Sequence, residues 1–159
     1  MSLLPIATVA PKAKTKDVTR IAIFYSVILV IFALCQLFTY EDFLQLMVSF
    51  NLPGGTPFTY FLTSLLVVAE VFALPFLLRL PLSRAFRWFS LGCGWLVPII
   101  WLFVTVVVAM NNSTADNIGF LGTVVSIMPG WWAVFISTAF FILAAWASWG
   151  LWPGKTRKK

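Results

Sequence analysis

The sequence of 159 residues contains no histidine and only two cysteines, Cys35 and Cys93. A structural zinc site combines about four Cys or His ligands, and a haem commonly needs an axial His. Ser-His-Asp and Cys-His catalytic arrangements also require histidine. The two cysteines form no CxxC motif, which disfavours thioredoxin-like exchange. We therefore predict no metal site and assign no catalytic residue.

Charged residues are also scarce, because they make up 10% of the chain, whereas globular domains contain roughly a quarter. Hydrophobic residues make up 61%, and the mean hydropathy is +0.97. A domain of this size cannot bury so much apolar surface. The composition excludes an ordinary soluble enzyme, a disordered tail and a disulfide scaffold, and it predicts a small polytopic membrane protein.

Four apolar runs approach the roughly 20 residues needed to cross a bilayer: 21–38, 58–78, 88–110 and 131–149. We predict an all-α fold, an integral membrane four-helix bundle over residues 21–152, with Asp17 as the N-cap of its first helix. Residues 1–20 and 153–159 are predicted to be basic tails. The first of these tails has no long apolar core, which disfavours a cleaved signal peptide.

Two of the segments between the spans are partly apolar. Residues 40–50 place Phe43, Leu46, Met47 and Phe50 at helical spacing, which predicts a short amphipathic helix on the outer membrane surface. Residues 118–128 are predicted to rest at the membrane interface as well.

The basic residues lie on one side of the predicted bundle. All eleven fall in the two tails or in the turn between the second and third spans: Lys12, Lys14, Lys16, Arg20, Arg79, Arg84, Arg87, Lys155, Arg157, Lys158 and Lys159. The other two loops hold only Glu41, Asp42 and Asp116. This positive-inside pattern predicts that both termini are cytoplasmic, in what we expect to be a bacterial cytoplasmic membrane. The basic residues then mark topology and contact the lipid bilayer, so we predict no nucleic-acid partner.

Glu70 is the only acidic residue inside a predicted span, where an acid is costly unless it faces the bundle interior. We expect Leu29, Trp95 and Phe141 at its depth. Pro98 frees the carbonyl of Gly94 near the same level. Trp95 or Tyr25 can donate a hydrogen bond to Glu70, or a protonated Glu70 can itself donate to such a freed carbonyl. The predicted ligand-binding residues share this region of the bundle: Glu70, Trp95, Tyr25, Thr63 and Thr138.

Two roles are open for Glu70. It can belong to a ligand or proton site, and burial without a cation then favours its neutral form at pH 7. Alternatively, it can be a polar clamp between helices or face a small water-filled cleft. Gln36 is expected near the outer end of its span, where it can form hydrogen bonds at the interface.

The stretches FALCQLFTYEDFLQLMVSFNLP and LLVVAEVFALPFLLRLPLSR are similar to the DoxX-like superfamily, which includes the DoxX and MauE types. The resemblance covers residues 21–153 and implies a four-helix membrane bundle whose second helix carries a glutamate, here Glu70. The family often has a lysine where the first span leaves the membrane, but Gln36 stands here. Some members are linked to sulfur or quinone oxidoreductase complexes and others to maturation of redox enzymes. EVFALP also resembles, more faintly, the EXPERA-type sterol-binding bundles.

Three functions follow as hypotheses. The first is a non-catalytic accessory subunit of a membrane complex, with a membrane-protein partner or self-association. The second is a binder of a small apolar ligand, a quinone or lipid, in a pocket at Glu70. The third is a quinone-linked oxidoreductase subunit with Glu70 as proton acceptor. No cofactor is evident beyond a possible quinone, and the lack of a Cys pair or a His favours a protein without its own redox activity.

Overall fold

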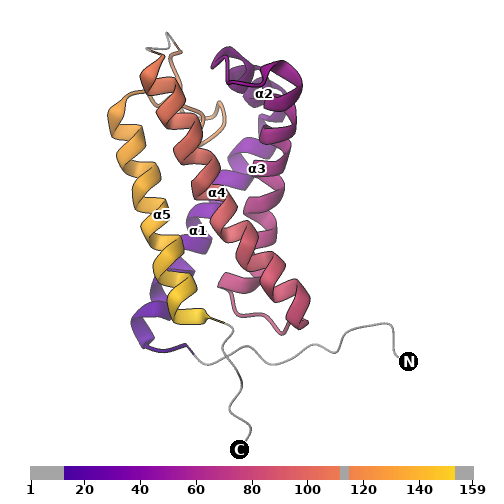
Figure 1. Ribbon diagram of the computed structural model, residues 1–159, viewed down its shortest axis with the longest axis vertical. Helices are drawn as coiled ribbons and strands as arrows, with labels where there is room; N and C mark the ends of the chain where they lie inside the picture. The colour runs from indigo at the N-terminus through magenta and orange to yellow at the C-terminus, as the bar shows by residue number, and fades with distance from the viewer. Residues whose placement is uncertain (1–12, 112–114, 153–159) are drawn as a thin grey trace, which may run out of the picture.

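The computed structural model describes residues 13–111 and 115–152, and this part of the chain is all-helical. Its helices are α1 (Lys16–Phe38), α2 (Tyr40–Ser49), α3 (Gly55–Leu77), α4 (Arg84–Met110) and α5 (Trp131–Leu151) (Figure 1). Four of them, all except α2, are long and apolar enough to cross a membrane. The predicted four-helix bundle, with a short helix after the first span, is confirmed. Residues 1–12 of the first predicted tail and the whole of the second, 153–159, lie outside the described residues.

The bundle has two distinct ends (Figure 1). The start of α1, the end of α5 and the turn between α3 and α4 lie at one end, which we call the terminal end. There the Lys14 N–H donates to the Gly150 carbonyl at 3.2 Å, and the Lys14 ammonium lies 4.1 Å from the centre of a Trp149 ring. Helix α2 and the connection from α4 to α5 lie at the opposite end, which we call the loop end. Between the two ends, α1 runs obliquely across the bundle.

Three of the long helices, α1, α3 and α4, begin earlier than the apolar runs, and in α1 and α4 a capped polar turn precedes the membrane-spanning residues. The Thr15 hydroxyl accepts from the Val18 N–H at 3.3 Å, so α1 begins at Lys16, and the prediction that Asp17 is the N-cap is wrong. Asp17 lies instead in the first turn, where a negative charge suits the helix dipole. Ser83 caps α4 in the same way by accepting from the Phe86 N–H, so α4 begins at Arg84.

Helices α3 and α4 are joined by a hydroxyl near Pro75. The Ser90 hydroxyl of α4 donates to the Phe72 carbonyl at 2.6 Å and accepts from the Phe76 N–H at 3.0 Å. In a regular helix these two backbone groups bond to each other. Ser90 therefore satisfies the backbone of α3 around Pro75, which has no N–H of its own.

Replacing Ser90 with alanine is expected to lower the free energy of unfolding by about 1–3 kcal/mol, because it takes a partner from the buried Phe76 N–H and from the part-buried Phe72 carbonyl. Unfolding in mixed micelles of detergent and sodium dodecyl sulfate measures this loss. The matched control is Ser148→Ala, since the Ser148 hydroxyl is also buried but bonds only to the Ala144 carbonyl of its own helix. Equal losses for the two variants would show that Ser90 does not join α3 to α4.

The connection from α4 to α5 enters the bundle instead of resting on it. Ile118 and Phe120 are buried in the core, whereas Val124 and Val125 are exposed. The prediction that residues 118–128 rest at the membrane interface is therefore wrong for the first part of this segment. Gly119 (φ 87°) and Gly122 (φ 58°) adopt left-handed backbone conformations, which let the chain turn into the core and out again. We call residues 117–127 the 117–127 loop.

Candidate functional site

Glu70 of α3 is fully buried, and its carboxyl group has one protein hydrogen bond. The side-chain amide of Gln36, on α1, donates to Glu70 Oε1 at 3.2 Å. The same Nε2 donates to the Phe120 carbonyl at 3.1 Å. One fully buried amide therefore joins the acid on α3 to the 117–127 loop.

The expectation that Gln36 forms hydrogen bonds at the membrane interface is wrong. On ideal helices perpendicular to the membrane, Gln36 and Glu70 would lie at different depths. In the structure, however, their side chains meet. Each side chain on an α-helix leans toward the N-terminus of its own helix. Because α1 and α3 run in opposite directions, Gln36 leans toward the terminal end and Glu70 leans toward the loop end. Because α1 also runs obliquely (Figure 1), the depth of Gln36 differs from the depth it would have on a helix perpendicular to the membrane.

Three buried polar atoms in this region have no hydrogen-bond partner: Glu70 Oε2, Gln36 Oε1 and Trp101 Nε1. The Trp101 indole faces the Glu70 carboxyl group without forming a hydrogen bond of regular geometry. We call Gln36, Glu70 and Trp101 the Glu70 cluster. A buried polar atom without a partner costs about 1–3 kcal/mol, so three of them around one point favour a further molecule as the partner.

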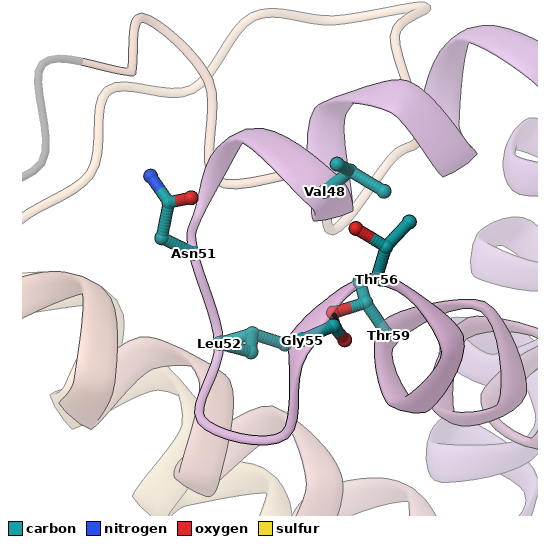
Figure 2. A pocket seen from close by; sticks show the side chains of 6 residues that line it. All are labelled: Val48, Asn51, Leu52, Gly55, Thr56 and Thr59. Atoms are coloured by element: carbon teal, nitrogen blue, oxygen red, sulfur yellow. Dashed lines mark hydrogen bonds between the residues drawn. The ribbon is translucent and has the colours of Figure 1, made fainter.

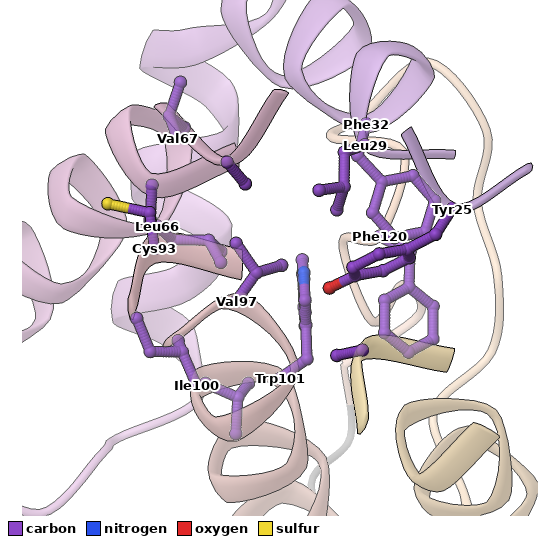
Figure 3. Packing of buried hydrophobic residues seen from close by; sticks show 14 of the residues in the cluster. Tyr25, Leu29, Phe32, Leu66, Val67, Cys93, Val97, Ile100, Trp101 and Phe120 are labelled. Atoms are coloured by element: carbon purple, nitrogen blue, oxygen red, sulfur yellow. The ribbon is translucent and has the colours of Figure 1, made fainter. Parts of the chain in front are cut away.

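Aromatic rings pack against the Trp101 side of the cluster. The Trp101 ring centre lies 4.6 Å from that of Phe120, and Phe120 stacks on Phe32 at 5.9 Å. Phe140 of α5 closes the group, with its ring centre 5.3 Å from Phe32. Figure 3 shows the indole of Trp101 with Tyr25, Phe32 and Phe120 on one side and Val97 on the other. These rings would contact the apolar body of a ligand whose polar head reached the cluster.

The residues predicted from the sequence fall into two groups. Tyr25 and Thr63 are buried with Glu70. The Tyr25 hydroxyl donates to the Gly94 carbonyl at 3.0 Å, and this is the acceptor that Pro98 was expected to free. The Thr63 hydroxyl donates to the Thr59 carbonyl of its own helix.

The structure does not bring the other two predicted residues to Glu70. Trp95 is half-buried and packs edge-on against Phe141, with ring centres 5.1 Å apart. Thr138 lies on the exposed face of α5, where its hydroxyl donates to the Val134 carbonyl. Leu29, Trp95 and Phe141 were expected at the depth of Glu70, and the side chains that the structure places against its carboxyl group are those of Gln36 and Trp101.

Sequence reasoning missed Gln36 and Trp101 beside Glu70, and it missed Phe120 as the second hydrogen-bond partner of Gln36. A signal for Gln36 was present, because it is the only amide side chain in the first apolar run. The sequence also contained a signal for Trp101, because this residue follows Gly94 and Val97 on one face of α4 at helical spacing. Phe120 had none, because it contributes a backbone carbonyl from a loop.

A separate hollow of about 150 Å³ lies at the loop end, between α2 and the start of α3 (Figure 2). It is lined by Val48, Asn51, Leu52, Gly55, Thr56 and Thr59. Thr59 precedes Glu70 by eleven residues, which is about 16 Å along a helix. The Thr59 hydroxyl already donates to the Gly55 carbonyl. This hollow is therefore not the Glu70 site.

Within residues 13–111 and 115–152, no three His, Cys, Asp or Glu side chains lie close enough together to hold a metal ion. No family model, no curated protein and no solved structure matches this chain. The class of this protein is therefore concluded from its own structure. With four helices that are long and apolar enough to span a bilayer, it is a small polytopic membrane protein with a buried acid in its core.

Proposed function

We propose that this protein binds an apolar ligand with a carbonyl or hydroxyl head at the Glu70 cluster. Quinones and lipids are the two sources of such a molecule in a membrane. The observation that carries the proposal is the group of three buried polar atoms without a hydrogen bond, one donor and two acceptors, beside the packed rings of Trp101, Phe120 and Phe32.

The cluster offers complementary chemistry to such a head. The indole N–H of Trp101 can donate to a ligand carbonyl, and a neutral Glu70 can donate a second hydrogen bond. The free amide oxygen of Gln36 can accept from a ligand hydroxyl. A quinone, which interconverts between carbonyl and hydroxyl forms, can use both kinds of partner.

The charge distribution supports an orientation for this site. The described basic residues lie at the terminal end: Lys14, Lys16, Arg20, Arg79, Arg84 and Arg87. Glu41, Asp42 and Asp116 lie toward the loop end. By the positive-inside rule, the terminal end faces the cytoplasm and the loop end faces outward. We propose a bacterial cytoplasmic membrane as the location.

The resemblance to the DoxX-like superfamily belongs to the same proposal. The order of a first span, a short helix and a second span with a buried glutamate supports membership. A family link to quinone-dependent complexes is compatible with a quinone ligand and with a role as an oxidoreductase subunit.

An accessory role in a membrane complex is the second candidate. It is favoured by exposed apolar side chains gathered at the loop end of α5 and just before it: Met128, Trp131, Trp132 and Phe135. Lipid covers such a surface as readily as a partner protein does. The same experiment distinguishes the two roles.

Native mass spectrometry of the mildly extracted full chain is the test. We expect a retained small molecule, identified by its mass as a quinone or a lipid. Trp101→Phe is expected to reduce its occupancy by about tenfold, because one buried hydrogen bond of roughly 1.4 kcal/mol is lost. Within the protein this variant removes only the contact of the indole with the Glu70 carboxyl group, which lacks regular hydrogen-bond geometry.

The matched control is Trp95→Phe, which makes the same substitution on the same helix but away from the Glu70 cluster, and it should retain the ligand. A co-purifying protein without a small molecule would support the accessory role instead. Wild-type protein with neither partner nor ligand would contradict both.

A further inference from the structure

We propose that the 117–127 loop is a lid over the Glu70 cluster, which opens toward the loop end to admit and release the ligand. A lid deepens the proposed function and rests on it for the identity of the ligand that is admitted.

The loop is held together as one unit by Asn117. The Asn117 Nδ2 donates to the Gly122 carbonyl at 2.9 Å, and its Oδ1 accepts from the Gly119 and Ile127 N–H groups at 3.0 and 3.1 Å. The Ile118 N–H donates to the Ile127 carbonyl at 2.7 Å, which brings the two ends of the loop together. A compact loop with adjoining ends is able to move as a body.

Its polar attachment to the helices is slight by comparison. The Gln36 amide donates to the Phe120 carbonyl, and the Thr123 N–H donates to the Thr39 hydroxyl at 3.1 Å. Both partners lie at the loop end of α1. Breaking these two hydrogen bonds and separating the Phe120 ring from Phe32 releases the loop from α1, while the bonds of Asn117 remain in place.

Opening the loop would change the ligand site directly. Phe120 would leave the ring of Trp101, which it contacts at 4.6 Å, and open space beside the indole. The Gln36 N–H that now donates to Phe120 would become available to a ligand. The exposed tip, with Val124 55% and Val125 46% exposed, keeps this edge of the loop clear of the helices.

Access to Glu70 can be measured without knowing the ligand. A water-soluble carbodiimide modifies carboxyl groups that it can reach, and mass spectrometry gives the labelled fraction at Glu70 in the full chain in detergent. Thr39→Val removes one attachment of the loop, so we expect it to raise the labelling rate about threefold to tenfold. Thr138→Val is the control, because that hydroxyl bonds only within α5 and should leave the rate unchanged.

A reversible cross-link provides the opposite test. The hydrogen bond between Thr123 and Thr39 keeps their Cα atoms within the about 7 Å that a disulfide can span. In the Thr39→Cys/Thr123→Cys double variant, oxidation is expected to suppress both labelling of Glu70 and exchange of the retained molecule, and reduction should restore both.

The possible failures are distinguishable. If the cross-link forms and labelling is unchanged, the lid is wrong, while ligand retention in the wild type still stands. If the cross-link suppresses labelling but the native spectrum shows no small molecule, the lid stands and the proposed function fails.

Discussion

Alanine at Gly122 is expected to lower the free energy of unfolding by about 2–5 kcal/mol. Gly122 has φ 58°, where an L-residue costs about 1–2 kcal/mol. A Cβ there would also lie 2.9 Å from the Cys35 carbonyl oxygen and 2.5 Å from the Thr39 hydroxyl. Backbone cannot move aside as a flexible side chain does, so overpacking adds about 1–3 kcal/mol. Unfolding in mixed micelles measures the loss.

Gly55→Ala is the matched control for this variant. Gly55 also has a positive φ, 75°, but the nearest atom to its added Cβ is 3.9 Å away. Gly55→Ala should therefore lower the free energy of unfolding only by the cost of the backbone conformation, about 1–2 kcal/mol. Equal losses at the two glycines would mean that the 117–127 loop is not seated against α1.

Replacing Gln36 with leucine is expected to lower the free energy of unfolding by about 2–4 kcal/mol. The variant removes the hydrogen bond to Glu70 and the one to the Phe120 carbonyl, and it leaves both acceptors buried without a partner. Leucine has nearly the same size, so the loss reflects hydrogen bonding more than packing. The effect should be measured alone and in a Glu70→Leu background.

In that background the cost of Gln36→Leu should fall by about 1 kcal/mol or more, because the acid that needed the amide is gone. Thr59→Val, a buried hydroxyl bonded within α3, is the control and should lose about the same free energy in both backgrounds. Additive losses for Gln36 and Glu70 would contradict the hydrogen bond between them.

The sequence predicts the framework of this protein well, because a membrane imposes simple rules. Apolar runs of about 20 residues located all four long helices, and the spacing of Phe43, Met47 and their neighbours located α2. The cost of an acid in lipid was enough to predict that Glu70 is buried. Tyr25 and the Gly94 carbonyl were likewise both singled out, although their bond to each other was not.

The partners of Glu70 needed information that residue spacing does not carry. The contact with Gln36 depends on the tilt of α1 and on the opposite lean of side chains in antiparallel helices. The entry of Phe120 into the core depends on the turns at Gly119 and Gly122 and on the hydrogen bonds of Asn117. Apolar loop residues beside a membrane look alike in sequence whether they face lipid or the bundle core.

The most direct test of the central claim is the labelling of Glu70 by a hydrophobic carbodiimide in three preparations: mildly extracted protein, delipidated protein, and delipidated protein given back the total lipid extract. A ligand whose head occupies the Glu70 cluster predicts little labelling in the first, a clear rise in the second and renewed protection in the third. Equal labelling of Glu70 in all three preparations would contradict a ligand at this site.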